Sequence, residues 1–359
     1  MLTSNYADDL VEDLAGRVYP QPHCLQTRSR IDLLIDRYLS LANLSDRLAD
    51  LPAQFANPQP RTWQAIYWHD INPSQIVGLR VEVFLAVLIG AMTVETPIRS
   101  YSQVSWHYLS HFHAPMASFV GGYFAEDGSI IEPGLWEKEE RRHSPALAKI
   151  YKHLTGEQLI VKSIQVKPYQ PSQNPHADMY RHGLHRVATE YGATCLYLWL
   201  MAHSTGALQQ VLEEILLDEI NHMTKFFGFG VWAFHSSDRN QFKSSLMGIL
   251  SRYGYRRSPS DLQTDRQIHK TSYGRLAALC VPPALELVRT FGRVMDLVNW
   301  KTWHPISKLE LTYTFVCVLR QLLRWRSGLT SAYLQKLFGN PPATCGNDTP
   351  SIPTVGVQR

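Results

Sequence analysis

Two Glu-x-x-His motifs constrain this chain more than any other feature of its sequence. The first joins Glu140 to His143, and the second joins Glu219 to His222. Three residues of an α-helix correspond to about 300° of rotation, so each glutamate and its histidine share one face, one turn apart. A carboxylate and an imidazole in this arrangement can bind one metal ion together.

Most of the chain has the apolar spacing of helices. Apolar residues recur at intervals of three and four, which predicts helices at 27–52, 74–111, 132–155, 176–202, 207–227, 239–253, 273–297 and 305–338. Pro97 is expected to kink the second of these helices. Residues 112–131 contain Gly121-Gly122 and Asp127-Gly128, which predicts a loop. Because no alternating strand pattern stands out, the predicted fold class is all-α.

Four consecutive predicted helices each place a carboxylate on an otherwise apolar face. The residues concerned, with the two histidines, are Glu95, Glu140, His143, Glu190, Glu219 and His222. This is the inventory of a dinuclear iron or manganese carboxylate site in a ferritin-like bundle, where two helices supply one glutamate each and two supply a Glu-x-x-His. Bridging carboxylates offset the repulsion between two cations, and one imidazole per metal leaves positions open for dioxygen.

The alternative interpretation is a set of buried salt bridges without any metal. A chain with 15 histidines is expected to contain about 0.6 Glu-x-x-His matches by chance, so the specificity comes from helix order and apolar surroundings. A buried carboxylate is costly unless it is paired or bound to a cation. Glu213 and Glu214 lie off the Glu219 face, and we expect both to be solvated.

The predicted architecture is a ferritin-like four-helix bundle core with additional N- and C-terminal helices. The hydrophobic fraction of 45% is sufficient for a large core. The predicted divisions are an N-terminal arm and helix at 1–73, the di-iron bundle at 74–235, a C-terminal helical extension at 236–339 that packs on the bundle, and a disordered tail at 340–359. The tail is assigned from its content of proline, glycine and threonine.

Composition narrows the function classes. The net charge is only +4 and 18% of residues are charged, which does not suggest a nucleic-acid-binding protein. Five scattered cysteines without a C-x-x-C favour reduced thiols in a cytosolic-type compartment. The acidic N-terminal stretch resembles neither a secretory signal nor a transit peptide. The apolar run Val83–Met92 is shorter than the ~20 residues of a membrane span, so a cytoplasmic protein without a transmembrane segment is expected.

The motif regions resemble the soluble acyl-carrier-protein desaturases, the stearoyl-type family of ferritin-like di-iron proteins. The stretch W-E-K-E-E-R-R-H, from Trp136 to His143, is similar to that family's W-x-x-E-E-N-R-H. M-T-V-E-T-P-I-R-S-Y around Glu95, T-E-Y-G-A-T and D-E-I-N-H resemble its other ligand helices. The resemblance covers about residues 80–225. Ser144-Pro145 replaces the family's Gly-Asp, and Ala193 replaces its threonine, so this chain would be a divergent member.

The resemblance implies roles for particular residues. It assigns the six residues above as metal ligands, with the four glutamates acting in catalysis through the metal. Asp218 falls where the family has an aspartate that supports a ligand histidine from behind. In the family, a tryptophan contacts this aspartate and extends the chain of hydrogen-bonded groups, the relay, from the metal toward the surface. Trp63 and Trp68 are the candidates for that tryptophan.

The function implied is an oxidoreductase that activates dioxygen and abstracts hydrogen from a carrier-bound acyl chain or another aliphatic chain. Two iron ions are the expected cofactor, manganese is the alternative metal, and dioxygen is the co-substrate. The resemblance also implies a ferredoxin-like electron donor, acyl carrier protein as a partner and a homodimer. The candidate basic docking points for such acidic partners are Arg141-Arg142, Arg256-Arg257 and the group Arg320, Arg324 and Arg326. The alternatives are another ferritin-like di-iron oxygenase (a hydroxylase, N-oxygenase, halogenase or chain-cleaving enzyme) and a non-catalytic metal-binding helical protein.

Overall fold

The computed structural model describes residues 24–49, 53–54, 57–111, 114–162, 166, 175–233 and 305–328. These residues are mostly helical, which confirms the predicted all-α class. The predicted helices at 239–253 and 273–297, the predicted tail at 340–359 and most of the N-terminal arm lie outside the described residues. The predicted boundary between a bundle and a C-terminal extension at 235–236 therefore stays a prediction.

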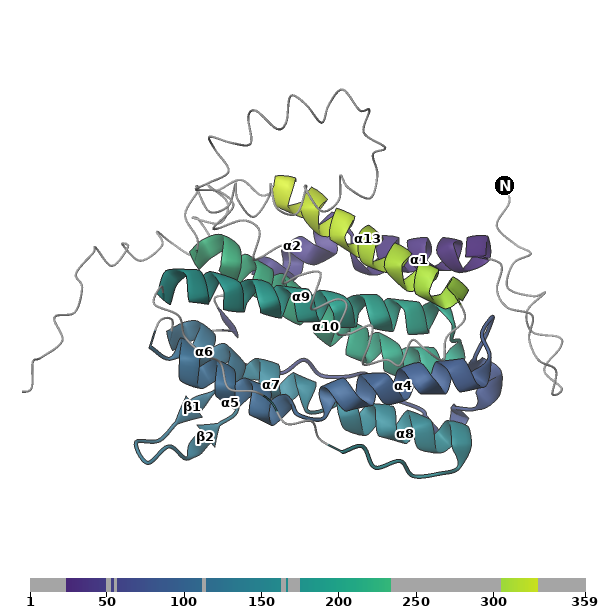
Figure 1. Cartoon of the computed structure of the whole chain (residues 1–359), viewed down its shortest axis with the longest axis horizontal. Coiled ribbons are helices and arrows are strands. Elements are labelled where there is room, and N and C mark those ends of the chain that lie inside the picture. The colour runs from purple at the N-terminus through teal and green to yellow at the C-terminus, as the bar shows by residue number, and fades with distance from the viewer. Residues whose placement is uncertain are drawn as a thin grey trace, which may run out of the picture.

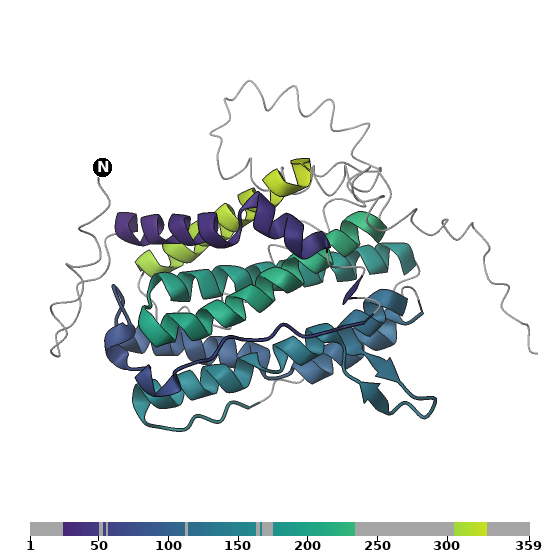
Figure 2. The same ribbon diagram turned by 180° about the vertical axis from the view of Figure 1, so that it is seen from behind.

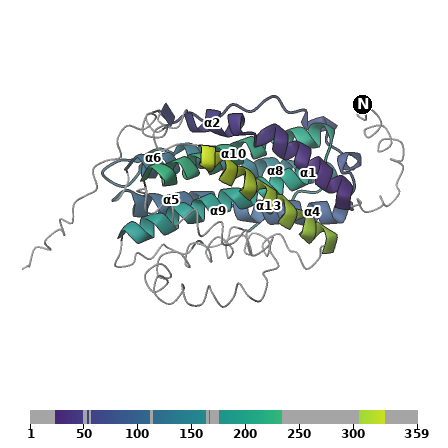
Figure 3. The ribbon, with the colours of Figure 1, turned by 90° about the horizontal axis from the view of Figure 1, so that it is seen from above.

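The described helices form three layers (Figure 1). The middle layer is an antiparallel pair, α9 (Pro175–Ala202) and α10 (Gly206–Ala233). The layer below contains α4 (Val81–Glu95), α5 (Ile98–Leu109), α7 (Leu135–Glu140) and α8 (His143–Thr155). The layer above contains α1 (Cys24–Tyr38), α2 (Leu41–Ala49) and α13 (Pro305–Gly328), and Figure 3 shows α1 and α13 lying across the middle pair.

Prolines divide the lower helices near the predicted ligands. Pro97 separates α4 from α5 directly after Glu95. The break between α7 and α8 falls at Arg141-Arg142, because Pro145 has no N–H to donate to the carbonyl of Arg141 and its ring crowds that turn. The kink expected at Pro97 is confirmed, although the helix begins at Val81 and not at residue 74. The predictions of unbroken helices at 132–155 and at 27–52 were wrong, and the second of these is divided into α1 and α2.

The segment predicted as a loop at 112–131 contains regular structure. Helix α6 (Ala114–Gly121) leads into the short antiparallel strands β1 (Tyr123–Phe124) and β2 (Ile130–Glu132). The expected absence of strands was therefore also wrong. The turn itself lies where glycine and aspartate predicted it, since the side chain of Asp127 accepts a hydrogen bond from the Ser129 amide at 2.8 Å.

Gly122 joins α6 to this hairpin in a conformation that other residues rarely adopt. Its φ is +91°, and a Cβ there would lie 1.9 Å from the Glu132 carbonyl oxygen. We expect Gly122→Ala to lower the free energy of unfolding by about 3 kcal/mol in denaturant titrations. Gly128→Ala is the matched control, because its φ is +79° but nothing lies within 4 Å, and its expected cost is about 1 kcal/mol. Equal costs for the two variants would contradict this account of Gly122.

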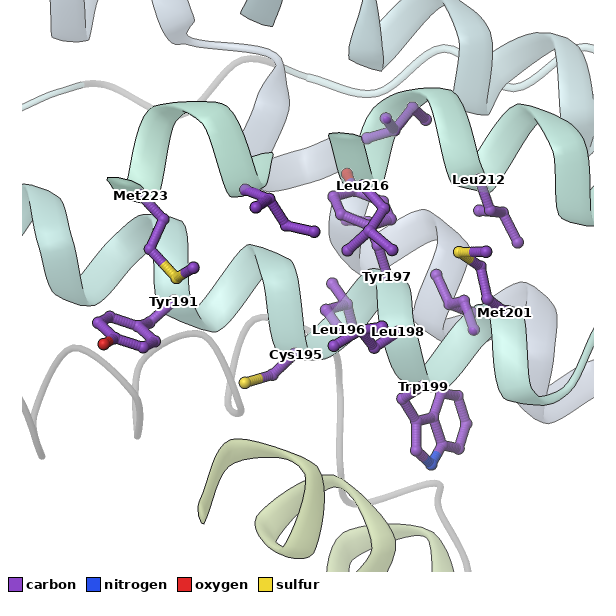
Figure 4. Close-up of a cluster of buried hydrophobic side chains, with 14 of the residues drawn as sticks. Tyr191, Cys195, Leu196, Tyr197, Leu198, Trp199, Met201, Leu212, Leu216 and Met223 are labelled. Atoms are coloured by element: carbon purple, nitrogen blue, oxygen red, sulfur yellow. The ribbon is translucent and has the colours of Figure 1, made fainter. Parts of the chain in front are cut away.

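Helix α9 is apolar on nearly all sides because it lies between two layers. Figure 4 shows the consequence: Tyr197, Leu216 and Met223 fill the space between α9 and α10, whereas Cys195 and Trp199 point to the opposite side, toward α13. All five of these side chains are buried. A charged side chain on α9 or α10 therefore has few routes to water.

One described helical segment, Val81–Leu109, is long and apolar enough to cross a membrane by length and composition. Its most apolar window is 56% buried inside the protein, and buried core helices of soluble proteins pass the same test. The expectation of no transmembrane segment stays a prediction.

Candidate metal centre

The fold brings the six predicted ligands together in the interior, between the lower and middle layers. They form two groups whose ligand atoms lie within 4.8 Å of one another, and each group can hold a metal ion. The first group is Glu95, Glu140, His143 and Glu219, and the second is Glu140, Glu190, Glu219 and His222. All six side chains are buried. Glu140 and Glu219 belong to both groups, so the two candidate positions share two carboxylates.

Glu140 occupies the middle of this centre. Its Oε2 lies 3.3 Å from His143 Nδ1, and its Oε1 lies 3.0 Å from His222 Nδ1. The two imidazole rings are 6.3 Å apart between centroids. Glu219 lies beside the first histidine, with Oε1 at 3.1 Å from His143 Nδ1. One carboxylate with an oxygen toward each histidine has the arrangement that a bridging ligand needs.

In each of the two remaining glutamates, Glu95 and Glu190, one carboxylate oxygen accepts a hydrogen bond from another side chain of the protein. Tyr197 donates its hydroxyl proton to Glu95 Oε1 at 2.9 Å, while Glu95 Oε2 lies 3.8 Å from His143 Nδ1. Trp136 donates its indole N–H to Glu190 Oε1 at 3.2 Å, while Glu190 Oε2 lies 3.7 Å from His222 Nδ1. Each carboxylate is thereby oriented with its second oxygen directed to the centre.

The outward nitrogens of both histidines face carboxylates. His143 Nε2 lies 3.2 Å from Asp218 Oδ2, and His222 Nε2 lies 2.9 Å from Glu139 Oε2. A carboxylate in this position accepts a hydrogen bond from Nε2–H, which orients the ring so that Nδ1 is directed at the centre. The arrangement is crossed, because the acid that precedes each motif glutamate contacts the histidine of the other motif. Asp218 was predicted in this position and Glu139 was not, although its place directly before Glu140 mirrors that of Asp218 before Glu219.

A segment outside the helices supplies a tryptophan that contacts Asp218. Residues 57–72 run along the outside of the bundle (Figure 2). Trp63 donates its indole N–H to Asp218 Oδ2 at 2.8 Å, whereas the ring of Trp68 lies 4.1 Å from Lys149 Nζ. Trp63 is half-buried, so the chain Trp63–Asp218–His143 reaches from the surface to the centre.

Two arginines close the outer side of the centre. Arg61 and Arg142 both donate to Asp218, at 2.8 Å and 3.0 Å. Arg61 also pairs with Glu214, which is buried, so the prediction of a solvated Glu214 was wrong. Glu213 is partly exposed and accepts a hydrogen bond from Tyr38. Because Arg142 is engaged inside the protein, the predicted basic docking point at Arg141-Arg142 is reduced to the exposed Arg141, which pairs with Glu137.

The pKa values of the buried glutamates in the centre are shifted by burial and by neighbouring charges. Burial raises the pKa of Glu95 to about 7, with the charge of Glu140 adding to this effect. Burial and the charge of Glu140 also raise the pKa of Glu219 well above its ordinary value. Burial opposes the charged form of Glu140 as well, but the two histidines outweigh it, so the pKa of Glu140 is lowered.

Both histidines favour the protonated form. Burial lowers the pKa of each imidazole, but the surrounding carboxylates more than offset this and hold the pKa of His143 and His222 well above the ordinary value. Metal binding at Nδ1 requires the loss of that proton, so the affinity for a metal ion is expected to rise with pH.

The chemistry of the donors fits a hard or borderline divalent cation. His143 Nδ1, His222 Nδ1 and both oxygens of Glu219 are buried and make no aligned hydrogen bond within the described part of the chain. Polar atoms left in this way cost free energy. These are the atoms that point to the shared centre, so a bound cation would satisfy them together.

The fold and the site thus define an all-α protein with a buried centre of four carboxylates and two imidazoles that can hold metal. No protein-family model, curated protein or solved structure matches the chain.

Proposed function

We propose that this protein is a dioxygen-activating di-iron oxidoreductase of the acyl-carrier-protein desaturase type, with manganese as the alternative metal. The observation that carries the proposal is the sharing of Glu140 and Glu219 between two ligand groups. A single-metal site or a salt-bridge cluster does not need two carboxylates common to two sets of ligands. Together with the crossed Glu-x-x-His motifs, this supports a ferritin-like dinuclear centre.

A reduced iron pair at such a centre supplies activation of dioxygen and removal of hydrogen from an unactivated carbon. The chain supplies the surroundings. Glu140 and Glu219 would offset the repulsion between two bound cations, and Tyr197 and Trp136 orient Glu95 and Glu190. The apolar layers on both sides exclude water, which limits side reactions.

Trp63 lies where electrons from an external donor would enter the protein on their way to the metal centre. Its indole contacts Asp218, which contacts His143, so three hydrogen-bonded groups link the half-buried tryptophan to the first ligand group. An external donor is required for each reduction. We propose a ferredoxin-like protein in that role, and acyl carrier protein as the carrier of an acyl or other aliphatic substrate.

A storage protein is the less favoured function. A storage bundle needs no path from the surface through an indole, and it needs no third layer of helices such as α1, α2 and α13. The N- and C-terminal helices extend the chain beyond the size of a small single domain.

Metal analysis and oxygen consumption test the proposal in one experiment. The protein is loaded anaerobically with Fe(II), then exposed to dioxygen together with an excess of chemically reduced ferredoxin and acyl carrier protein charged with a saturated fatty acid. We expect two irons per chain, oxygen uptake that exceeds oxidation of the iron itself, and a product lighter by two hydrogens in mass spectrometry.

Each other outcome has a defined meaning. A product heavier by one oxygen would overturn desaturation in favour of the oxygenase alternative. Iron binding without substrate-dependent oxygen uptake, for acyl carriers and free aliphatic acids alike, would overturn the enzymatic proposal in favour of a metal-binding protein. A folded protein that binds no metal would overturn the dinuclear centre itself.

A further inference from the structure

Arg61 makes contacts with both halves of the candidate metal centre although it belongs to none of the helices. Its Nε donates to Asp218 Oδ1 at 2.8 Å, and its Nη1 donates to Glu214 Oε2 at 2.5 Å. Its backbone N–H donates to Glu139 Oε1 at 2.6 Å. Its carbonyl accepts from Arg142 Nη1 at 2.6 Å. One residue therefore holds the acids behind both histidines.

The two acids reach different ligand groups. Asp218 contacts His143, a member of the first group, and Glu139 contacts His222, a member of the second. The guanidinium of Arg61 contacts Asp218, and the backbone amide of Arg61 contacts Glu139. The position of that amide depends on where the side chain is anchored, because the forked contacts of the guanidinium fix the segment against α10.

We propose that Arg61 is a positioning residue that couples the two halves of the metal centre. It does so by anchoring its own backbone amide to Glu139 through its side-chain contacts with Asp218 and Glu214. The inference rests on the proposed metal binding but not on oxidation chemistry. Trp63 lies two residues along the same segment, so the same anchor also places the indole on Asp218.

The expected effects follow from the loss of orienting groups. Removing an acid or its partner behind a metal-ligating histidine typically lowers metal affinity by about 10- to 100-fold. Asp218 keeps Arg142 as a donor when Arg61 is changed, because Arg142 belongs to another segment. Glu139 loses its amide contact if the segment moves, and Arg142 Nη2 then remains 3.7 Å from Glu139 Oε1. Changing the side chain of Arg61 is therefore expected to affect the second ligand group through Glu139, which that side chain does not contact.

A double-mutant cycle tests the coupling with Mn(II) as the probe. Mn(II) affinity is measured for wild type, Arg61→Gln, Glu139→Gln and the double variant, with free Mn(II) followed by electron paramagnetic resonance. We expect about a 10-fold loss or more for each single variant. We expect the double variant to be weakened by clearly less than the product of the two single losses, because Arg61→Gln already removes the contact that Glu139→Gln alters.

Thr62→Ala and Gln64→Ala are the controls, since both side chains are exposed on the same segment. Arg61→Lys keeps the charge without the forked contacts, and its affinity is expected to lie between those of wild type and Arg61→Gln. If Arg61→Gln does not fold, as judged by circular dichroism, Arg61→Lys takes its place in the cycle. Its single loss is expected to be smaller, and the loss of the double variant should again be less than the product of the two single losses.

Two results would overturn the coupling. One is an Arg61 variant whose Mn(II) affinity equals that of Thr62→Ala, and the other is a double variant whose loss equals the product of the single losses. A folded wild-type protein that binds no Mn(II) and no Fe(II) would instead overturn the proposed function on which the coupling rests. The two failures are thus distinguishable in one set of titrations.

Discussion

Glu140→Gln is expected to abolish binding of both metal ions, with the affinity of the whole centre falling by at least about 100-fold. Glu140 belongs to both ligand groups and directs one oxygen to each histidine. A neutral amide cannot offset the repulsion between two cations. The metal content after anaerobic loading with Fe(II), measured by elemental analysis, should fall from two irons per chain to none.

Glu137→Gln is the matched control for this variant. Glu137 lies one turn earlier in α7 and is as deeply buried as Glu140, but it contacts Ser102 and Arg141 and belongs to neither ligand group. We expect this variant to keep two metal ions. Glu140→Gln protein that retains both ions, or equal metal losses in the two variants, would contradict a bridging role for Glu140.

Glu219→Gln is expected to abolish metal-induced stabilisation and, without metal, to be more stable than wild type near neutral pH. Burial and the charge of Glu140 raise the pKa of Glu219, so the folded protein holds a proton that the unfolded chain releases above its ordinary pKa of 4.5. Stability from such a group is present below pH 4.5 and is lost as the pH rises toward the folded-state pKa. Glutamine does not titrate, so it removes this loss.

The contribution of Glu95 to stability has the same pH dependence. Its pKa is raised to about 7, so this contribution is lost between pH 4.5 and about pH 7. Thermal unfolding of metal-free protein from about pH 5 to about pH 8 should therefore show a decline in the wild type and a weaker decline in Glu219→Gln. Glu213→Gln, six residues earlier in α10 and partly exposed, should follow the wild type. A steeper decline in Glu219→Gln than in the wild type would contradict the pKa assignment.

The two predictions have one physical cause, the crowding of buried carboxylates in the centre. Four buried carboxylates next to one another are unfavourable for the fold, and the two histidines offset only part of this cost. A protein keeps such an arrangement at a functional site because binding of a ligand offsets the unfavourable free energy. The same residues can therefore be detrimental to the metal-free fold and necessary for metal binding.

The ligand identities could be predicted because they depend on local periodicity. Residues three apart in a helix share a face, and an isolated glutamate such as Glu190 on an apolar stretch is unusual within any helix. Asp218 was expected only from the family resemblance, because it lies off the face that Glu219 and His222 share. The break at Pro97 was expected from the proline itself, whereas the break at Arg141-Arg142 was not predicted, because the spacing of apolar residues continues across a broken helix.

The contacts around the ligands could not be predicted in this way. Arg61 and Trp63 lie in a segment with no helical period, and their partners are more than 70 residues away in the chain. Glu139 offered a signal through its position beside Glu140, but the sequence does not show which histidine it meets. Glu214 lies off the ligand face of α10 and is buried in an ion pair with Arg61, a partner that the spacing along α10 does not indicate.

The sequence by itself determined which side chains are available to the centre, because helical periodicity is a property of neighbouring residues. Only the tertiary structure decided how they are used. The position of Glu140 between two histidines, the crossed pairing of Asp218 and Glu139, and the contacts of Arg61 all depend on how α7, α8 and α10 are packed against each other. That packing is set by apolar contacts along the whole bundle, which no local spacing records.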